Sequence, residues 1–242
     1  MINYNCKNCG SPLSLNGNEK YINCLYCNTS FVIEGNQDNI DLSDLLRAAQ
    51  TAEQSDNYIE ALSFYNSALL KDENNFYALI GKAFASLAVF TYGKLNFKEF
   101  DFYFKRAMQN KNSIDDITIH EIILDKIWTM LGHSATIATN IFTDKYSTSS
   151  LAGNEYVDNL IVLHNVQKII ADVVDCVEHE NVSDVYKDCY LEFKNASIAH
   201  GEQIFNVAKK FGVKVDKQLI KEIKMFIKKS QKDLKIFKKR YS

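Results

Sequence analysis

Two cysteine pairs near the start of the chain could bind a metal ion. Cys6 and Cys9 form the first Cys-x-x-Cys pair, and Cys24 and Cys27 form the second after fourteen intervening residues. Two such pairs at this separation can place four thiolates at the corners of one tetrahedron, which is the arrangement that a structural zinc ion requires. A closed set of four thiolates leaves no open position for water or substrate, so the sequence predicts one structural Zn²⁺.

Short strands are expected between the cysteine pairs and after the second pair. Leu13 and Leu15 precede a turn signal at Asn16–Asn18, and Tyr21 follows it. A further apolar run, Phe31–Ile33, comes after the second pair. This pattern predicts about three short strands that hold the cysteines.

Residues 4–34 resemble the zinc-ribbon family in its rubredoxin-like form, on the basis of the two cysteine pairs and the short strands. The resemblance implies that Cys6, Cys9, Cys24 and Cys27 are the ligands of one zinc ion, or of iron taken up by the same site. The alternative is a set of four thiols without metal. Asn28 departs from the glycine that often follows the second pair in the family, and the departure leaves the four ligands unchanged.

The chain as a whole is predicted to be mostly α, with a small N-terminal β zinc ribbon followed by an all-α body. A single proline in 242 residues and a hydrophobic content of 46% favour continuous helices over linkers. The expected parts are a zinc ribbon at 1–35, a polar linker at 36–41, helical hairpins at 42–112 and a helical C-terminal region at 113–242.

The first two helices of the body are predicted to form a hairpin. Apolar residues recur at three- and four-residue steps on both sides of a break at Ser55–Asn57, which is typical of two packed helices. Residues 57–72 resemble the second helix of a tetratricopeptide repeat, and a weaker second unit begins at Tyr77. The resemblance covers residues 42–110 and implies that another protein binds a groove lined by the first helix of each unit. The alternative is that these helices only pack against the rest of the body.

The repeat positions give seven candidate partner-binding residues. They are Leu46, Gln50, Glu53, Gln54, Ala78, Lys82 and Ser86. The Lys and Asn pattern with which some family members clamp the terminal carboxylate of a peptide is absent, so binding of a chaperone tail is not expected.

Helices and one loop are predicted after residue 113. The polar, small-residue run Thr143–Asn154 favours the loop. The helices are expected at Asp115–Leu131, Ala135–Tyr146, Val157–Glu178, Val182–Phe211 and Lys217–Tyr241.

The last predicted helix separates positive charge from apolar residues. Its lysines and its apolar residues both recur every three or four positions, and at about 100° per residue the two sets fall on nearly opposite faces. The lysine face could follow a phosphate backbone, lie on an anionic membrane, match the acidic remainder of the chain, or simply be solvated. The candidate anion-binding residues are Lys217, Lys221, Lys224, Lys228, Lys232, Lys235 and Lys239.

Catalytic motifs are not recognisable in the sequence. The segment His120–Leu124 begins like a metalloprotease helix, but a leucine stands where the second metal-binding histidine is required. A remote enzyme alternative would need a pocket that brings together His120, His133, His164 and Glu155. We therefore expect no enzyme and no catalytic residues.

The N-terminal residues lack a signal peptide, and no apolar run reaches the roughly 18 residues of a transmembrane helix. These features predict a cytoplasmic protein. The combined expectation is a non-catalytic, zinc-binding adaptor or scaffold that binds another protein, whose identity the sequence does not give. The alternative is a nucleic-acid-binding or regulatory protein that uses the basic C-terminal helix.

Overall fold

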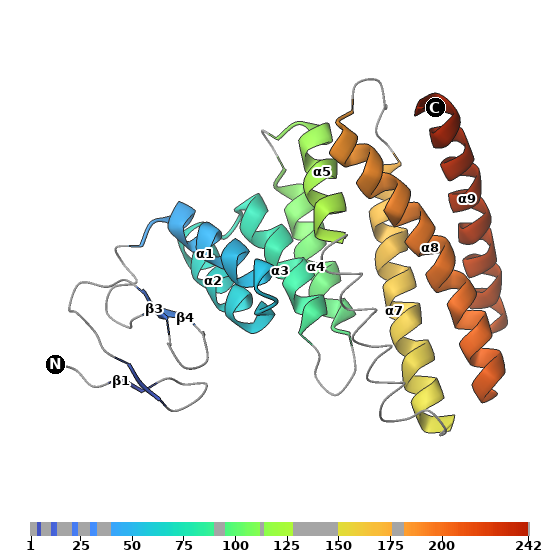
Figure 1. Cartoon of the computed structure of the whole chain (residues 1–242), viewed down its shortest axis with the longest axis horizontal. Coiled ribbons are helices and arrows are strands. Elements are labelled where there is room, and N and C mark those ends of the chain that lie inside the picture. Colours follow the sequence, from blue (N-terminus) through green and yellow to red (C-terminus); the bar gives the residue numbers. More distant parts are fainter. Residues whose placement is uncertain are drawn as a thin grey trace. The chain divides into compact units, whose positions relative to one another are not determined.

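The computed structural model divides the chain into two compact units (Figure 1). It describes residues 4–5, 11–13, 21–23, 30–32, 40–89, 95–111, 114–127, 150–175 and 182–241. Within these ranges, the prediction of a mostly α-helical chain is confirmed. The first unit comprises residues 1–85 and 103–110, and the second comprises 86–102 and 111–242. The expected boundary lies near residue 112, whereas this division passes through α3 (Phe76–Ala88) and α4 (Phe97–Gln109).

Two antiparallel strand pairs lie in the N-terminal part of the first unit. β1 (Tyr4–Asn5) pairs with β2 (Pro12–Leu13), and β3 (Tyr21–Asn23) pairs with β4 (Ser30–Val32). The sequence did not predict β1, because two residues are too few to show the alternation that indicates a strand.

The predicted hairpin of the first unit is formed by α1 (Leu42–Gln54) and α2 (Tyr58–Lys71), which pack against each other. Asp56 takes a left-handed conformation with φ of 56° in the turn, as Asp tolerates better than most residues. Asn57 then caps α2: its side chain accepts a hydrogen bond from the Glu60 backbone N–H and donates one to the Glu60 carboxylate. This reciprocal capping explains where α2 begins.

A close contact joins α2 to α3. Tyr65 is buried on α2, and its ring lies so near Gly81 on α3 that a Cβ atom there would stand 2.0 Å from the ring. The absence of a side chain at Gly81 therefore permits the approach of the two helices. Phe84 on α3 and Phe104 on α4 continue this core with an edge-to-face contact.

Four described helices of the second unit pack around a common core. The helix α8 contacts each of the other three, as Figure 1 shows for the neighbouring α7 and α9. Their bounds are α5 (Asp116–Lys126), α7 (Ser150–Val174), α8 (Asp184–Phe211) and α9 (Lys217–Tyr241). The predicted helix at Ala135–Tyr146 lies outside the described residues.

The predicted loop at Thr143–Asn154 is wrong in its last part, because α7 already begins at Ser150. Gly153 lies in the predicted loop, but it belongs to the helix and lies against Phe211 of α8. A Cβ atom at this position would come within 2.5 Å of the Phe211 Cβ atom. Gly153 therefore serves close helix packing rather than a turn.

The last helix begins and ends where the sequence predicts. Gly212 ends α8 with φ of 66°, and the Val213 N–H donates to the Ala208 carbonyl oxygen at 2.9 Å. This αL ending is common after helices, and glycine adopts it without steric cost.

Among the described helices, none combines the length and the hydropathy of a membrane span.

Candidate functional site

The two strand pairs have matched registers next to the cysteine pairs. Asn5 is opposite Pro12 in the first strand pair, and Asn23 is opposite Ser30 in the second. Six residues therefore connect each pair of partners, namely 6–11 and 24–29. In both connections the cysteines stand at the first and fourth positions. Each Cys-x-x-Cys sequence thus directly follows one strand, and two residues separate its second cysteine from the partner strand.

The four predicted metal ligands, Cys6, Cys9, Cys24 and Cys27, lie outside the described residues. Their donor set fits zinc, because four thiolates from two pairs are the usual ligands of a structural zinc ion. Within the ranges that the structure describes, no group of three or more His, Cys, Asp or Glu side chains could hold a metal. Cys189, on α8, is a free thiol whose pKa is raised mainly by burial.

Four of the seven candidate groove residues are buried, which corrects the expectation that they form a binding surface. Ala78 and Ser86 are inaccessible on α3. Glu53 is buried on α1, where its carboxylate accepts a hydrogen bond from Tyr65, and burial, followed by this carboxylate, raises the pKa of that tyrosine. Repeat position indicates which helix face a residue occupies, but it did not account for the neighbours that cover that face.

Lys82 is also buried, and its ammonium group already has partners. It donates to the Asn66 side-chain oxygen and, at 2.7 Å, to the Tyr103 hydroxyl. The ammonium group therefore joins α2, α3 and α4 within the first unit. The remaining candidates are on α1, where Leu46 is half-buried and Gln50 and Gln54 are exposed.

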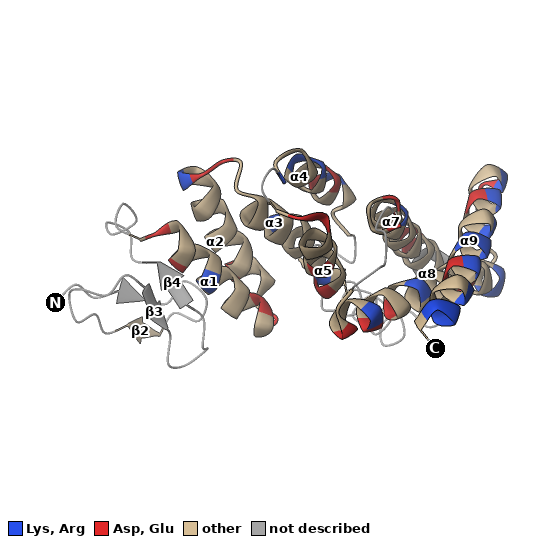
Figure 2. Cartoon of the chain, turned by 90° about the horizontal axis from the view of Figure 1, so that it is seen from above, with Lys and Arg blue, Asp and Glu red and all other residues tan. Residues whose placement is uncertain are grey.

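The seven lysines predicted to form a cationic face on α9 are all exposed. Figure 2 shows basic residues recurring along the whole helix. The apolar residues Ile223, Phe226 and Phe237 are buried instead. The predicted separation of charged and apolar faces is therefore present, and the face of lysines, here called the lysine face, consists of Lys217, Lys221, Lys224, Lys228, Lys232, Lys235 and Lys239.

A buried ionic cluster, which the sequence analysis missed, connects the C-terminal end of α7 with α8 and α9. Lys194 of α8 is 1% exposed, and its ammonium group lies 2.6 Å from Asp175 Oδ1 and 3.0 Å from Asp233 Oδ2. Lys229 of α9 contacts the other oxygen of Asp175 at 2.9 Å. The two lysines thus balance the two carboxylates. A sequence signal existed, because Lys194 and Asp233 both stand at three- and four-residue steps from the buried residues of their helices.

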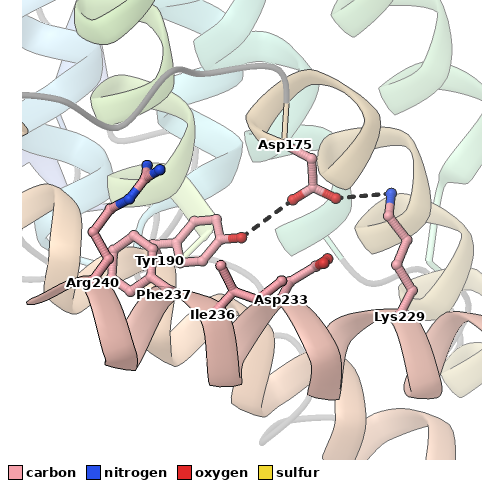
Figure 3. A pocket seen from close by; sticks show the side chains of 7 residues that line it. All are labelled: Asp175, Tyr190, Lys229, Asp233, Ile236, Phe237 and Arg240. Atoms are coloured by element: carbon pink, nitrogen blue, oxygen red, sulfur yellow. Dashed lines mark hydrogen bonds and ion pairs between the residues drawn. The ribbon is translucent and has the colours of Figure 1, made fainter.

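A pocket of about 450 Å³ opens beside this cluster (Figure 3). Tyr190 and Phe237 stack at 4.4 Å and form its aromatic wall, and burial followed by the nearby Asp175 raises the pKa of the tyrosine. The carboxylates that line the pocket are already bound to lysines, so the arrangement joins helices rather than presenting a reactive group. The lining residues are Asp175, Tyr190, Lys229, Asp233, Ile236, Phe237 and Arg240.

The residues of the remote enzyme alternative are not brought together in this pocket, which contains none of the described His120, His164 and Glu155. His133 lies outside the described residues. His120 is buried with its ring nitrogens against the backbone carbonyl oxygens of Asp116 and, at 2.7 Å, Val173. It therefore braces α5 against α7.

A second polar group, in which His164 and Gln167 are buried and His200 is half-buried, lies among α7, α8 and α9. The side-chain nitrogen of Gln167 is 2.9 Å from Nδ1 of His200, and His164 packs edge-to-face on Phe226 with ring centres 5.0 Å apart. Burial lowers the pKa of each histidine to about 4; at His164 the nearby Lys168 adds to this effect. Both imidazoles are therefore neutral near pH 7.

Comparisons with known proteins give no family for the chain. No family model, no curated protein and no solved structure matches it.

Proposed function

We propose that this chain is a non-catalytic, zinc-binding protein that binds another protein through its helical hairpin. The observation that carries the zinc proposal is the matched register of the two strand pairs. Each pair flanks six residues with cysteines at positions one and four. Such a repeat of local geometry supports two equivalent halves of one tetrahedral site.

Purified full-length protein is expected to contain one zinc ion per chain. Changing Cys24 and Cys27 to serine should reduce the zinc content to near zero, because two thiolates alone do not complete a structural site. Cys189→Ser is the matched control and should retain the zinc, since Cys189 is a separate thiol on α8. Elemental analysis after exhaustive dialysis gives the content. A metal-free wild type, or iron in place of zinc, would contradict this proposal.

Exposed apolar side chains on α2 support a protein partner for the hairpin. Ile59 is 73% exposed and Leu70 is 86% exposed. They are eleven residues apart, about three helical turns, so they lie on the same face of α2. Isolated apolar residues are common at protein surfaces, but two large ones on one helix face can anchor a partner that buries them.

The double variant Ile59→Ser, Leu70→Ser is expected to weaken capture of partner proteins at least tenfold, corresponding to about 1.4 kcal/mol. Capture can be measured by cross-linking in a lysate of the source organism, followed by mass spectrometry. The control is Val185→Ser, Ile236→Ser, which removes two exposed apolar side chains from the second unit. A third variant, Leu46→Ala, Gln50→Ala, Gln54→Ala, tests the remaining groove positions on α1. Equal capture by all four proteins would rule out the hairpin as the binding surface.

A further inference from the structure

The lysine face of α9 is narrow and long. At about 100° and 1.5 Å per residue, its seven lysines fall within a sector of roughly 80° and extend over about 33 Å. Consecutive lysines are therefore spaced by about 5.5 Å along the helix axis. The seven lysines thus form a line of charge along the helix, and the exposed Lys229, Lys238 and Arg240 lie outside its sector.

The acidic residues of α9 do not neutralise this line. Glu222 is 3.5 Å from Lys168 of α7, and Asp233 is bound to Lys194 of α8. Among the described residues, none of the seven lysines makes an ion pair or a hydrogen bond; Lys224 alone has a ring contact, 5.8 Å from the centre of Phe205. The carboxylates of the helix thus serve packing, and the lysine charges remain directed outward.

The opposite face of α9 packs against other helices of the second unit, chiefly α8. Ile223 and Phe226 are buried, and Ile227 lies so close to Gly201 of α8 that a Cβ atom there would be 2.7 Å from its Cδ1. An amphipathic helix that binds a membrane inserts its apolar face between lipids. The apolar stripe that includes Ile223 and Phe226 is thus already covered, and the exposed Met225 and Ile236 are single apolar side chains rather than a continuous apolar face, so charge is the main feature that α9 presents to a ligand.

We infer that the lysine face binds the phosphate backbone of a nucleic acid without reading its sequence. A linear polyanion complements a line of cations more closely than a planar lipid surface does, and backbone contacts by lysine supply affinity rather than base specificity. The face contains neither arginine nor an aromatic side chain with which to read or stack bases. This inference is independent of the zinc proposal and of the hairpin.

Salt dependence tests the inference directly. The probes are a fluorescein-labelled 20-base-pair DNA duplex and a 20-nucleotide single-stranded RNA, titrated with the full-length protein and followed by fluorescence anisotropy. A straight helix can follow a curved backbone over only part of its length, so we expect about five phosphate contacts. The duplex affinity should then fall roughly 500-fold between 50 and 200 mM salt, with a logarithmic slope of about −4.5. Duplexes of unrelated sequence should bind equally.

Two variants of equal charge separate the lysine face from net charge. Lys221, Lys224, Lys228 and Lys232 are replaced by glutamine in the first, and affinity at 100 mM salt should fall at least tenfold. The control replaces Lys71, Lys98, Lys105 and Lys111 by glutamine and should bind within twofold of the wild type. Circular dichroism checks that both remain folded. Equal loss in the two variants, no binding of either nucleic acid at 50 mM salt, or tighter binding to phosphatidylserine vesicles than to nucleic acid would overturn the inference.

Discussion

Replacement of Lys194 by methionine is expected to lower the free energy of unfolding by about 3–5 kcal/mol. Its ammonium group is buried and contacts the carboxylates of Asp175 and Asp233. Methionine keeps the length and helix propensity of the side chain but removes the charge. The two carboxylates, themselves 16% and 23% exposed, would then lie close together without the cation that they share. Urea denaturation followed by circular dichroism measures the loss.

The matched control for this prediction is on the same helix. Lys187→Met removes an ion pair with Asp184, whose side chain is 92% exposed, so the expected loss is below about 1 kcal/mol. In the double variant Lys194→Met, Asp233→Leu, part of the lost stability should return, because the variant no longer buries Asp233 without a counter-ion. If Lys194→Met and Lys187→Met were equally mild, the cluster would not stabilise the bundle.

Lowering the pH from 7 to 5 is expected to reduce the free energy of unfolding by up to about 2 kcal/mol for each of His164 and His200. The pKa of each imidazole falls from 6.5 to about 4 on folding, chiefly because burial disfavours the charged form. Below pH 6.5 the unfolded chain therefore binds protons that the folded chain does not bind. This part of the stability is complete above pH 6.5 and is lost as the pH falls towards 4.

The variant His164→Leu isolates one of these protons. Between pH 7 and pH 5, the free energy of unfolding of this variant should fall by up to about 2 kcal/mol less than that of the wild type, whatever its stability at pH 7. His200→Leu should reduce the slope in the same way, although it also removes the contact with Gln167. Urea titrations at half-unit pH steps provide the comparison. If the pH dependence were unchanged in both variants, the pKa of neither imidazole would fall on folding.

The sequence predicted the last helix well because one periodicity determines both of its faces. The apolar stripe that includes Ile223 and Phe226 packs inside the second unit, and the lysines on the opposite stripe are exposed. Such a helix can be placed without knowledge of its neighbours, since each residue's face follows from its position along the helix.

Contacts between elements could not be predicted in this way. Lys82 was expected in a groove, but Asn66 and Tyr103, on two other helices, receive its ammonium group. Gly153 belongs to a run whose polar and small residues predict a loop, whereas here it permits the approach of Phe211. Lys194 and Asp233 could have been suspected as a pair, because each interrupts the buried face of its helix, but only the fold brings Asp175 to the same ammonium group.

The short turn at Gly212 also bears on the order in which the second unit folds. It separates α8, which ends at Phe211, from α9, which starts at Lys217. The residues that pack near the turn are close in sequence, so α8 and α9 can meet with little loss of chain entropy. Proteins rich in such local contacts fold rapidly. Helices α8 and α9 should therefore begin to pack early, from the turn outward. Of the two carboxylates that Lys194 contacts, Asp175 is nineteen residues away and Asp233 is thirty-nine residues away, so the ion pair that joins α8 to α9 is the less local of the two and should form later.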